Sequence, residues 1–307
     1  MSFTLRFLKD LPFYNEVQPY KIYGHPELSP EVESNLEFED AENVVAKNIR
    51  QCQHLCCFAD EGFEVVTSPS SCPLRAGIFE QRTPESDEII TTYLEEMMDM
   101  VKRRLKATTV FRRNDAAALS QELPPGDIRK QAIPVATIVH CDFSFDGGHE
   151  RIRMHLTDDE TESVESGRSK PMIVNVWRPL STVTNAPLVM SDRRSIWQQD
   201  IIEADQGMAD KVTKTAFLFH RPDQKWYWLP NQQPDEVFMF ATWTPPTGDK
   251  RAGQVNFAEQ SEMTFTDYCL DYSPHAAAFL HQTEGDVTPR ESVEVRMIVL
   301  QDTMLLE

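Results

Sequence analysis

His140 and Asp142 are the residues whose types and spacing point most directly to chemistry. They follow the apolar stretch 132–139 and stand before a glycine turn at 143–148. Side chains two residues apart on a strand project from the same face, so an imidazole and a carboxylate converge here. His275 is the candidate for a third ligand, completing the two-histidine, one-carboxylate facial triad that holds non-heme Fe(II). Without a metal, His140 and Asp142 would form only a strand-end salt bridge.

Arg290 and Ser292 form a candidate site for an anionic cosubstrate. They lie two residues apart at the start of the last apolar run, 293–300, and would share one face of a strand. An arginine fork is suited to bidentate capture of a carboxylate. A His-x-Asp pair, a distal histidine and an Arg-x-Ser pair, in this order, are what a 2-oxoglutarate oxygenase needs.

Arg178 and Arg296 compete with Arg290 for that carboxylate. On a regular strand, Glu294 and Arg296 point inward beside Arg290, so strand parity does not separate the two arginines. Arg178 has two interpretations, because it would either hold a substrate or cosubstrate carboxylate or pair with an acid such as Asp192.

Other histidines compete with His275 for the metal. His220 and His281 lie in the same half of the chain. We expect His220 to cap a strand and His281 to line the mouth of the site. His149 and His155 follow the glycine turn, and we expect both of them on the surface or in loops.

Several blocks of sequence resemble the hydroxylase/desaturase family that includes the fungal gibberellin desaturases, AsaB-type enzymes and the cephamycin 7-alpha-hydroxylase component. The resemblance runs from about Phe63 to Leu300 and includes the Pro-His pair at His275 and the Arg-x-Ser pair at Arg290. It implies a double-stranded β-helix that uses Fe(II) and 2-oxoglutarate. The main blocks, in the order of the family, are 139–142, 175–180 with 187–195, 225–230 with 234–237, and 289–296.

The expected function is that of a 2-oxoglutarate-dependent dioxygenase, which hydroxylates or desaturates a small specialised metabolite and releases succinate and CO2. Two alternatives remain open. One is a metal-dependent oxygenase or isomerase of the same fold that does not consume 2-oxoglutarate. The other is a metal-free partner protein of a methyltransferase, as in the cephamycin system.

The elements that must position these residues are mostly short strands. They are β-branched or aromatic and bounded by Pro, Asp and Gly, and we expect them at 108–112, 133–139, 173–177, 188–191, 215–220, 226–229, 237–243 and 292–300. One helix is predicted over 84–106, capped near Ser86, from apolar residues at helical spacing with acids early and bases late. The segment 158–170 is rich in Asp, Glu and Ser and predicts an exposed loop.

Many short strands without βαβ units favour a mainly β fold with flanking helices and a jelly-roll core. We expect one catalytic domain over 1–307, with the core in 130–300. Residues 1–65 read as an irregular extension wrapping that core, with a short helix within 41–56.

The composition excludes several classes of partner. The formal net charge of −19 over 307 residues argues against nucleic acid and anionic membranes. No run approaches the roughly 20 apolar residues that span a bilayer, and the N-terminus does not resemble a signal peptide. The six cysteines lack the spacing of a disulfide scaffold or a zinc site. These features predict a cytoplasmic protein with a small-molecule substrate, and an oligomer is compatible with them.

Overall fold

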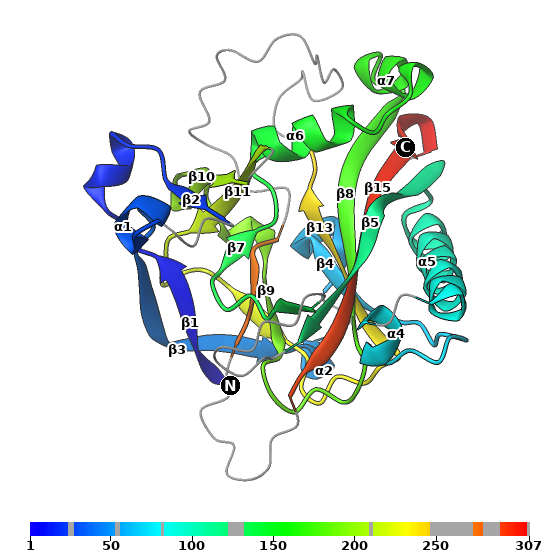
Figure 1. Cartoon of the computed structure of the whole chain (residues 1–307), viewed down its shortest axis with the longest axis horizontal. Helices are drawn as coiled ribbons and strands as arrows, with labels where there is room; N and C mark the ends of the chain where they lie inside the picture. The colour runs from blue at the N-terminus through cyan, green and yellow to red at the C-terminus, as the bar shows by residue number, and fades with distance from the viewer. Residues whose placement is uncertain are drawn as a thin grey trace.

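The computed structural model describes residues 1–23, 28–52, 56–80, 83–121, 132–208, 211–245, 273–278 and 289–305. Within these residues the strands form two sheets that share an apolar core (Figure 1). That core joins Phe3, Leu218 and Cys141 of the larger sheet to Ile173 and Ile298 of the smaller one. The arrangement is a sandwich, as predicted for a jelly-roll core.

The larger sheet contains nine of the described strands and carries the N-terminus of the chain. In spatial order they are β1 (Ser2–Leu8), β3 (Phe38–Asn48), β12 (Trp226–Trp228), β9 (Leu188–Ser191), β14 (His275–Ala277), β7 (His140–Cys141), β11 (Val212–Leu218), β10 (Ile201–Gly207) and β2 (Tyr20–Ile22). The neighbours β7 and β14 are far apart in sequence, so the sheet joins two distant segments.

The smaller sheet contains six of the described strands. In spatial order they are β4 (Phe63–Thr67), β13 (Glu236–Trp243), β8 (Ser169–Pro179), β15 (Glu291–Asp302), β5 (Thr109–Gln121) and β6 (Ala132–Pro134). Alternation places Asn175 and Trp177 of β8 on the inner face, and Val174 and Val176 on the outer face.

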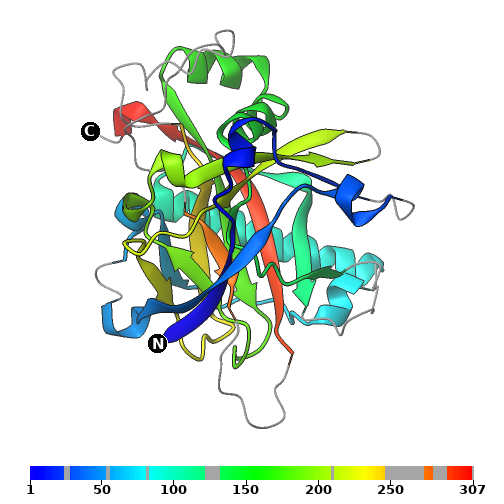
Figure 2. The ribbon, with the colours of Figure 1, turned by 90° about the vertical axis from the view of Figure 1, so that its left-hand side faces the viewer.

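Helix α5 (Pro84–Leu105) covers that outer face and confirms the predicted helix. Tyr93, Leu94, Met97 and Val101 pack in one cluster with valines of β8 and β15. Figure 2 shows α5 behind the smaller sheet, on the side away from β1 and β3. The cap is Thr83, whose side chain accepts from the Ser86 amide while Ser86 bonds back, so Ser86 belongs to the capping box.

The remaining helices are short. They are α1 (Pro30–Glu33), α2 (Ile49–Cys52), α3 (Phe58–Glu61), α4 (Ala76–Glu80), α6 (Phe145–Arg153) and α7 (Asp158–Glu165), with 3-10 turns η1 (Pro12–Asn15), η3 (Arg193–Ser195), η4 (Gln198–Asp200) and η5 (Thr303–Leu305). No helix among the described residues has both the length and the apolar character needed to cross a membrane.

Most of the predicted strands correspond to strands in the structure, with shifted ends. The prediction for 188–191 matches β9, whereas 173–177 is the centre of a longer β8. The prediction for 133–139 was wrong for most of its length, because β6 ends at Pro134 and β7 begins only at His140, and between them Ile138 forms an isolated bridge with Arg6. Strand β10, with its polar residues, was not predicted.

The described part of residues 1–65 is not irregular. They contribute β1, β3 and β4, and β1 pairs with β3 in antiparallel register. The helix expected within 41–56 is reduced to the short α2, because residues up to Asn48 extend β3, with Val44 and Ala46 buried. The pairing with β1 and β12 therefore outweighs the local helical preference.

Two predicted loops are helices. Helix α7 replaces most of the loop expected at 158–170, since Thr157 and Glu160 form a capping box and Val164 packs on Leu300. Helix α6 replaces the glycine turn at 143–148, with Ser144 as its cap. The glycines serve close packing, because a Cβ at Gly148 would overlap the Trp243 ring.

Candidate metal centre

The two sheet neighbours β7 and β14 bring the predicted metal ligands together. His140 and His275 are direct partners in the antiparallel register, and their ring centroids are 4.6 Å apart. Asp142 follows two residues after His140, with its Oδ1 3.6 Å from His140 Nε2. One ligand atom from each of the three residues lies within 4.8 Å of the others. The three side chains therefore form the group that a facial triad requires.

Backbone carbonyls orient both imidazoles. His140 Nδ1 lies 2.8 Å from the Ile138 carbonyl oxygen, and His275 Nδ1 lies 3.2 Å from that of Ser273. A histidine that donates from Nδ1 to a carbonyl presents the lone pair of Nε2 to a metal. The donor set is thus two imidazole nitrogens and one carboxylate oxygen, which fits a divalent iron ion.

Asp142 is held by a second layer of polar side chains. Its Oδ2 accepts from Asn175 Nδ2 at 2.7 Å and pairs with Arg296 Nη2 at 2.9 Å. Burial opposes ionisation, but Arg296 and the two histidines outweigh it, so the pKa of Asp142 lies well below its usual range. The carboxylate is therefore charged, with Oδ1 directed to the side of His140.

The two histidines differ in basicity. Burial, followed by the proximity of His140, lowers the pKa of His275 to about 4. For His140 burial acts in the same direction, but the hydrogen bond and charge of Asp142 outweigh it and raise the pKa. His275 is therefore neutral near pH 7, which is the form that binds a metal.

Glu294 and Arg296 point inward on β15, as strand parity predicts. Glu294 Oε1 accepts from Asn175 Nδ2 at 2.7 Å and from Arg296 Nη2 at 3.2 Å. Burial, followed by the charge of Asp142, raises the pKa of Glu294 to about 7. Asn175 joins this network to Asp142, and no sequence argument had selected Asn175. Its position on β8 opposite Arg296 is the signal that would have found it.

Arg290 and Ser292 lie farther along the same inner face of the smaller sheet. Arg290 is 5% exposed, its Nη1 donates to the Ala186 carbonyl at 2.7 Å, and its guanidinium lies 5.1 Å from the Trp177 ring centroid. Ser292 is completely buried and pairs with Pro179 of β8. Arg290, just before β15, and Arg296, on β15, thus both face the interior, and Arg296 is the one in contact with a metal-ligand candidate.

Arg178 lies on the opposite face of the smaller sheet, and this corrects its predicted role. Its Nε donates to Tyr93 Oη at 3.1 Å, and its Nη2 donates to the Ser68 carbonyl at 2.7 Å. Its Nη1 donates to the Pro234 carbonyl. Neither cosubstrate binding nor a pair with Asp192 fits this placement, because the guanidinium packs under α5, away from the triad.

The structure also shows where the other candidate histidines lie. His220 packs on Phe7 of β1, with ring centroids 5.0 Å apart. Its imidazole therefore lies against the side of β1 that faces the apolar core. His149 was expected on the surface but is 7% exposed, because α6 buries it beside Trp243. His155 is half-buried. His281 lies outside the described residues.

Comparison with known proteins gives a family match over most of the chain. The family model "Oxidoreductase/YMDC permease-like domain" matches residues 5–300. The chain is 26% identical over 278 residues to hydroxylase/desaturase efuI of Hormonema carpetanum, covering 83% of this chain and 82% of that protein. It is 26% identical over 222 residues to alpha-ketoglutarate-dependent dioxygenase tstK of Talaromyces stipitatus, covering 70% and 72% of the two chains.

A solved structure gives the same result for the fold. The chain superposes on the iron and alpha-ketoglutarate-dependent endoperoxidase NvfI with a TM-score of 0.76 and 21% sequence identity, over 98% of each chain. This similarity confirms the predicted jelly-roll fold. Because the family model spans residues 5–300, the chain belongs to the oxidoreductase/YMDC permease-like family, and its resemblance to AsaB-type hydroxylase/desaturases is confirmed.

Proposed function

We propose that the protein is an Fe(II)- and 2-oxoglutarate-dependent dioxygenase that hydroxylates or desaturates a small specialised metabolite. The observation that carries the proposal is the convergence of His140, Asp142 and His275, whose ligand atoms lie within 4.8 Å of one another. The names of the relatives efuI and tstK support the same class of reaction. The chain would act as one catalytic domain.

The protein side chains have distinct tasks in this proposal. His140, Asp142 and His275 would hold the iron, which together with 2-oxoglutarate and oxygen supplies an oxidant for unactivated C–H bonds, with succinate and CO2 as co-products. Asn175 and Arg296 keep Oδ2 of Asp142 engaged, at 2.7 and 2.9 Å, so that Oδ1 remains for the metal.

Arg290 is our candidate for binding the distal carboxylate of 2-oxoglutarate, together with Ser292. Trp177, on which the Arg290 guanidinium lies, packs in one apolar cluster with Phe238, Phe240 and Met190. The Phe240 ring also lies 4.7 Å from the His275 ring. An apolar wall thus runs from the triad to a buried guanidinium, which suits a dicarboxylate with an aliphatic centre.

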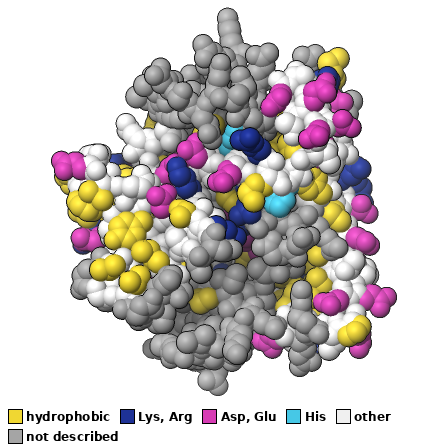
Figure 3. Space-filling view, turned by 45° about the horizontal axis from the view of Figure 1, so that its top comes forward, with side chains coloured by type: hydrophobic (Ala, Val, Ile, Leu, Met, Phe, Trp, Pro, Cys, Tyr) yellow, Lys and Arg dark blue, Asp and Glu magenta, His cyan; other side chains and the backbone are white. Residues whose placement is uncertain are grey.

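The substrate would meet Glu294 and Arg296 beside the triad. Their side chains keep 24% and 27% exposure, although both lie on an inner sheet face. Figure 3 shows basic, acidic and histidine side chains close together near the centre of one face of the molecule. We infer a small substrate with polar groups, and the net charge of −19 makes a nucleic acid an unfavourable partner.

We also propose a cytoplasmic location. The described cysteines Cys52, Cys56, Cys57, Cys72 and Cys141 carry free thiols, which suits a reducing compartment. Fractionation of the source cells with an antibody to the protein tests this location.

Turnover of the cosubstrate tests the proposed reaction. Anaerobically Fe(II)-loaded protein is mixed with 2-oxoglutarate and oxygen, and succinate is measured against oxygen uptake. We expect succinate from the wild type and none above background from His140→Ala or Asp142→Ala. Oxygen uptake without succinate would instead support an oxygenase that does not use 2-oxoglutarate. Failure of the wild type to retain iron would support the metal-free partner protein.

A further inference from the structure

The strand that carries His275 is short and is held at its start by main-chain bonds. The Ser191 amide donates to the Pro274 carbonyl at 2.9 Å, and the Ser273 amide donates to the Ala241 carbonyl at 3.1 Å. Any residue type except proline could donate these bonds. They fix the path of the backbone, but they do not explain the choice of side chain at position 273.

The Ser273 side chain makes a further contact with a different element. Its Oγ donates to the Glu61 carbonyl at 2.9 Å, at the end of α3, and the residue is 1% exposed. Gly62 follows with a φ of +85°, and a Cβ there would overlap Ser273 Oγ. The carbonyl of the same Ser273 faces His275 Nδ1 at 3.2 Å. One residue therefore both anchors the strand and orients the imidazole.

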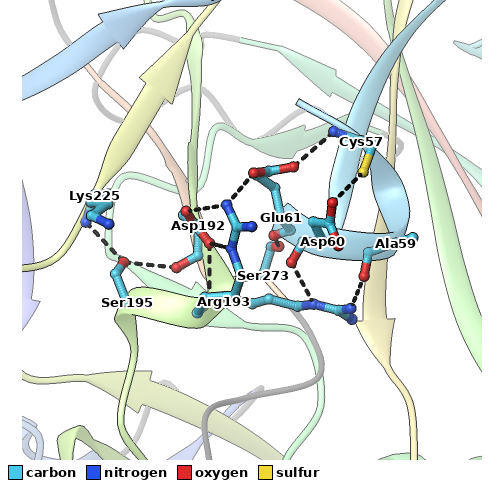
Figure 4. Close-up of polar contacts among 10 residues, drawn as sticks. Cys57, Ala59, Asp60, Glu61, Asp192, Arg193, Ser195, Lys225 and Ser273 are labelled. Atoms are coloured by element: carbon cyan, nitrogen blue, oxygen red, sulfur yellow. Dashed lines mark hydrogen bonds and ion pairs between the residues drawn. The ribbon is translucent and has the colours of Figure 1, made fainter. Parts of the chain in front are cut away.

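The end of α3 is itself fixed by a charged cluster (Figure 4). Glu61 is 3% exposed, and its carboxylate accepts from the Cys57 amide at 2.8 Å and pairs with Arg194. Arg194 also pairs with Asp192 at 3.0 Å, directly after β9. Arg193 donates to the Asp60 carbonyl at 3.0 Å.

The contacts of this cluster link α3, β9 and β14 around His275, the third candidate metal ligand. Strand β9 is the sheet neighbour of β14, with Met190 opposite His275. Helix α3 is joined to the end of β9 by Arg193 and Arg194, and to β14 by Ser273. Although Cys57, Asp60 and Glu61 have metal-ligating types, Glu61 is already used by Arg194. The cluster is therefore better suited to support than to metal binding.

We propose that Ser273 is a positioning residue for His275, and that α3 acts through it to set the geometry of the metal centre. This inference rests on the proposed iron site. The physical reason is that a metal site tolerates little displacement of a ligand, and groups that orient a histidine ligand contribute to metal affinity.

Metal affinity of the variant Ser273→Ala tests the proposal without turnover. Co(II), as a spectroscopic substitute for Fe(II), is titrated anaerobically into the protein, and the dissociation constant and the visible absorption are recorded. We expect affinity to fall roughly 10- to 100-fold, with an altered absorption spectrum, while the far-UV circular dichroism stays unchanged.

Ser195→Ala is the matched control. Ser195 is also a buried serine, but among the described residues its Oγ hydrogen-bonds only to main-chain atoms, donating to the Asp192 carbonyl at 2.7 Å and accepting from the Lys225 amide at 2.9 Å. We expect its affinity and spectrum to match the wild type. Wild-type affinity in Ser273→Ala would overturn the inference, whereas absence of Co(II) binding in the wild type would overturn the proposed function itself.

A double-mutant cycle with Gly62→Ala tests the contact between the two elements. Gly62→Ala should weaken Co(II) binding because its Cβ displaces Ser273 Oγ. The strain of the positive φ is the same in both backgrounds and cancels in the cycle. We therefore expect a smaller loss of affinity when Gly62→Ala is added to Ser273→Ala. Equal losses in both backgrounds would show that this contact does not control the metal centre.

Discussion

At the scale of single residues, the proposed role of Asp142 as a metal ligand depends on which groups bind each of its two carboxylate oxygens. Asn175 and Arg296 both bind Oδ2, and Glu294 in turn accepts from both of them. Such a network fixes the orientation of a carboxylate more strictly than one contact would. Asn175 is neutral, so its removal tests orientation without changing the charge near the metal.

Asn175→Ala is expected to weaken Fe(II) or Co(II) binding by roughly 10- to 100-fold, as for other groups that orient metal ligands. The loss of the 2.7 Å bond frees Asp142 to rotate. Anaerobic calorimetric titration measures the change. Asn48→Ala is the control, because the Asn48 side chain accepts from the nearby Arg50 amide at 2.9 Å and has no described hydrogen bond to a candidate metal ligand. Equal metal affinity in Asn175→Ala and the wild type would contradict this role.

Asp142 also predicts a pH dependence of the metal-free protein. Its pKa is lowered in the folded state from an ordinary value of 3.8, so it stabilises the fold above that pH. This contribution is lost as the pH falls below about 4, because the unfolded chain then binds the proton first. We expect Asp142→Asn to be less stable than the wild type at pH 7. Thermal unfolding from pH 3 to 7 should show the difference shrinking with acid, and a constant difference would refute the assignment.

At the scale of elements, α5 is attached to the smaller sheet by a buried polar contact as well as by apolar packing. Tyr93 is fully buried and accepts from Arg178 Nε at 3.1 Å, and Arg104 pairs with Glu64 of β4 at 2.7 Å. The helix lies on the outer face, so its attachment should affect stability and leave the metal centre unchanged.

Tyr93→Phe is expected to lower the free energy of unfolding by about 1–3 kcal/mol, because a buried guanidinium donor loses its acceptor. Urea denaturation measures the loss, and Co(II) affinity of the folded variant should equal that of the wild type. Unchanged stability of the variant, or weakened metal binding, would contradict a purely stabilising role for the Tyr93–Arg178 hydrogen bond.

Elements with strong local signals could be predicted from the sequence. Helix α5 combines periodic apolar residues with a capping box, and β9 is a short run of apolar residues. Strand β3 could not be predicted in this way, because its exposed polar residues are explained only by its pairing with β1 and β12. The glycines of α6 were misread because their small size serves close packing, that of Gly147 on the Lys214 main chain and that of Gly148 on the Trp243 ring.

At the scale of the whole molecule, the fold joins residues from distant parts of the chain. The order of motifs was enough to name His140, Asp142 and His275 as candidate ligands, and the pairing of β7 with β14 brings their side chains together. The order of motifs did not show which arginine faces the site, because the sheet face that a side chain occupies depends on strand register. Arg178 on β8 points to α5, whereas Arg290 before β15 points to the interior.

This difference predicts opposite phenotypes for two arginine variants. Arg290→Met should raise the KM for 2-oxoglutarate at least about tenfold, because a charged hydrogen bond contributes ~1.5–3 kcal/mol. Arg178→Met should reduce stability and leave that KM unchanged, since its donors bind Ser68, Pro234 and Tyr93. Steady-state kinetics and thermal unfolding of both variants separate the two roles. A raised KM in Arg178→Met alone would reverse the assignment.

The location of bound iron tests the central claim most directly. Crystals are grown anaerobically with Fe(II) and 2-oxoglutarate, and anomalous scattering is measured at the iron absorption edge. We predict one strong peak within bonding distance of His140 Nε2, Asp142 Oδ1 and His275 Nε2. A peak bonded to other side chains, or an iron-free centre in protein that was saturated with Fe(II), would contradict the account.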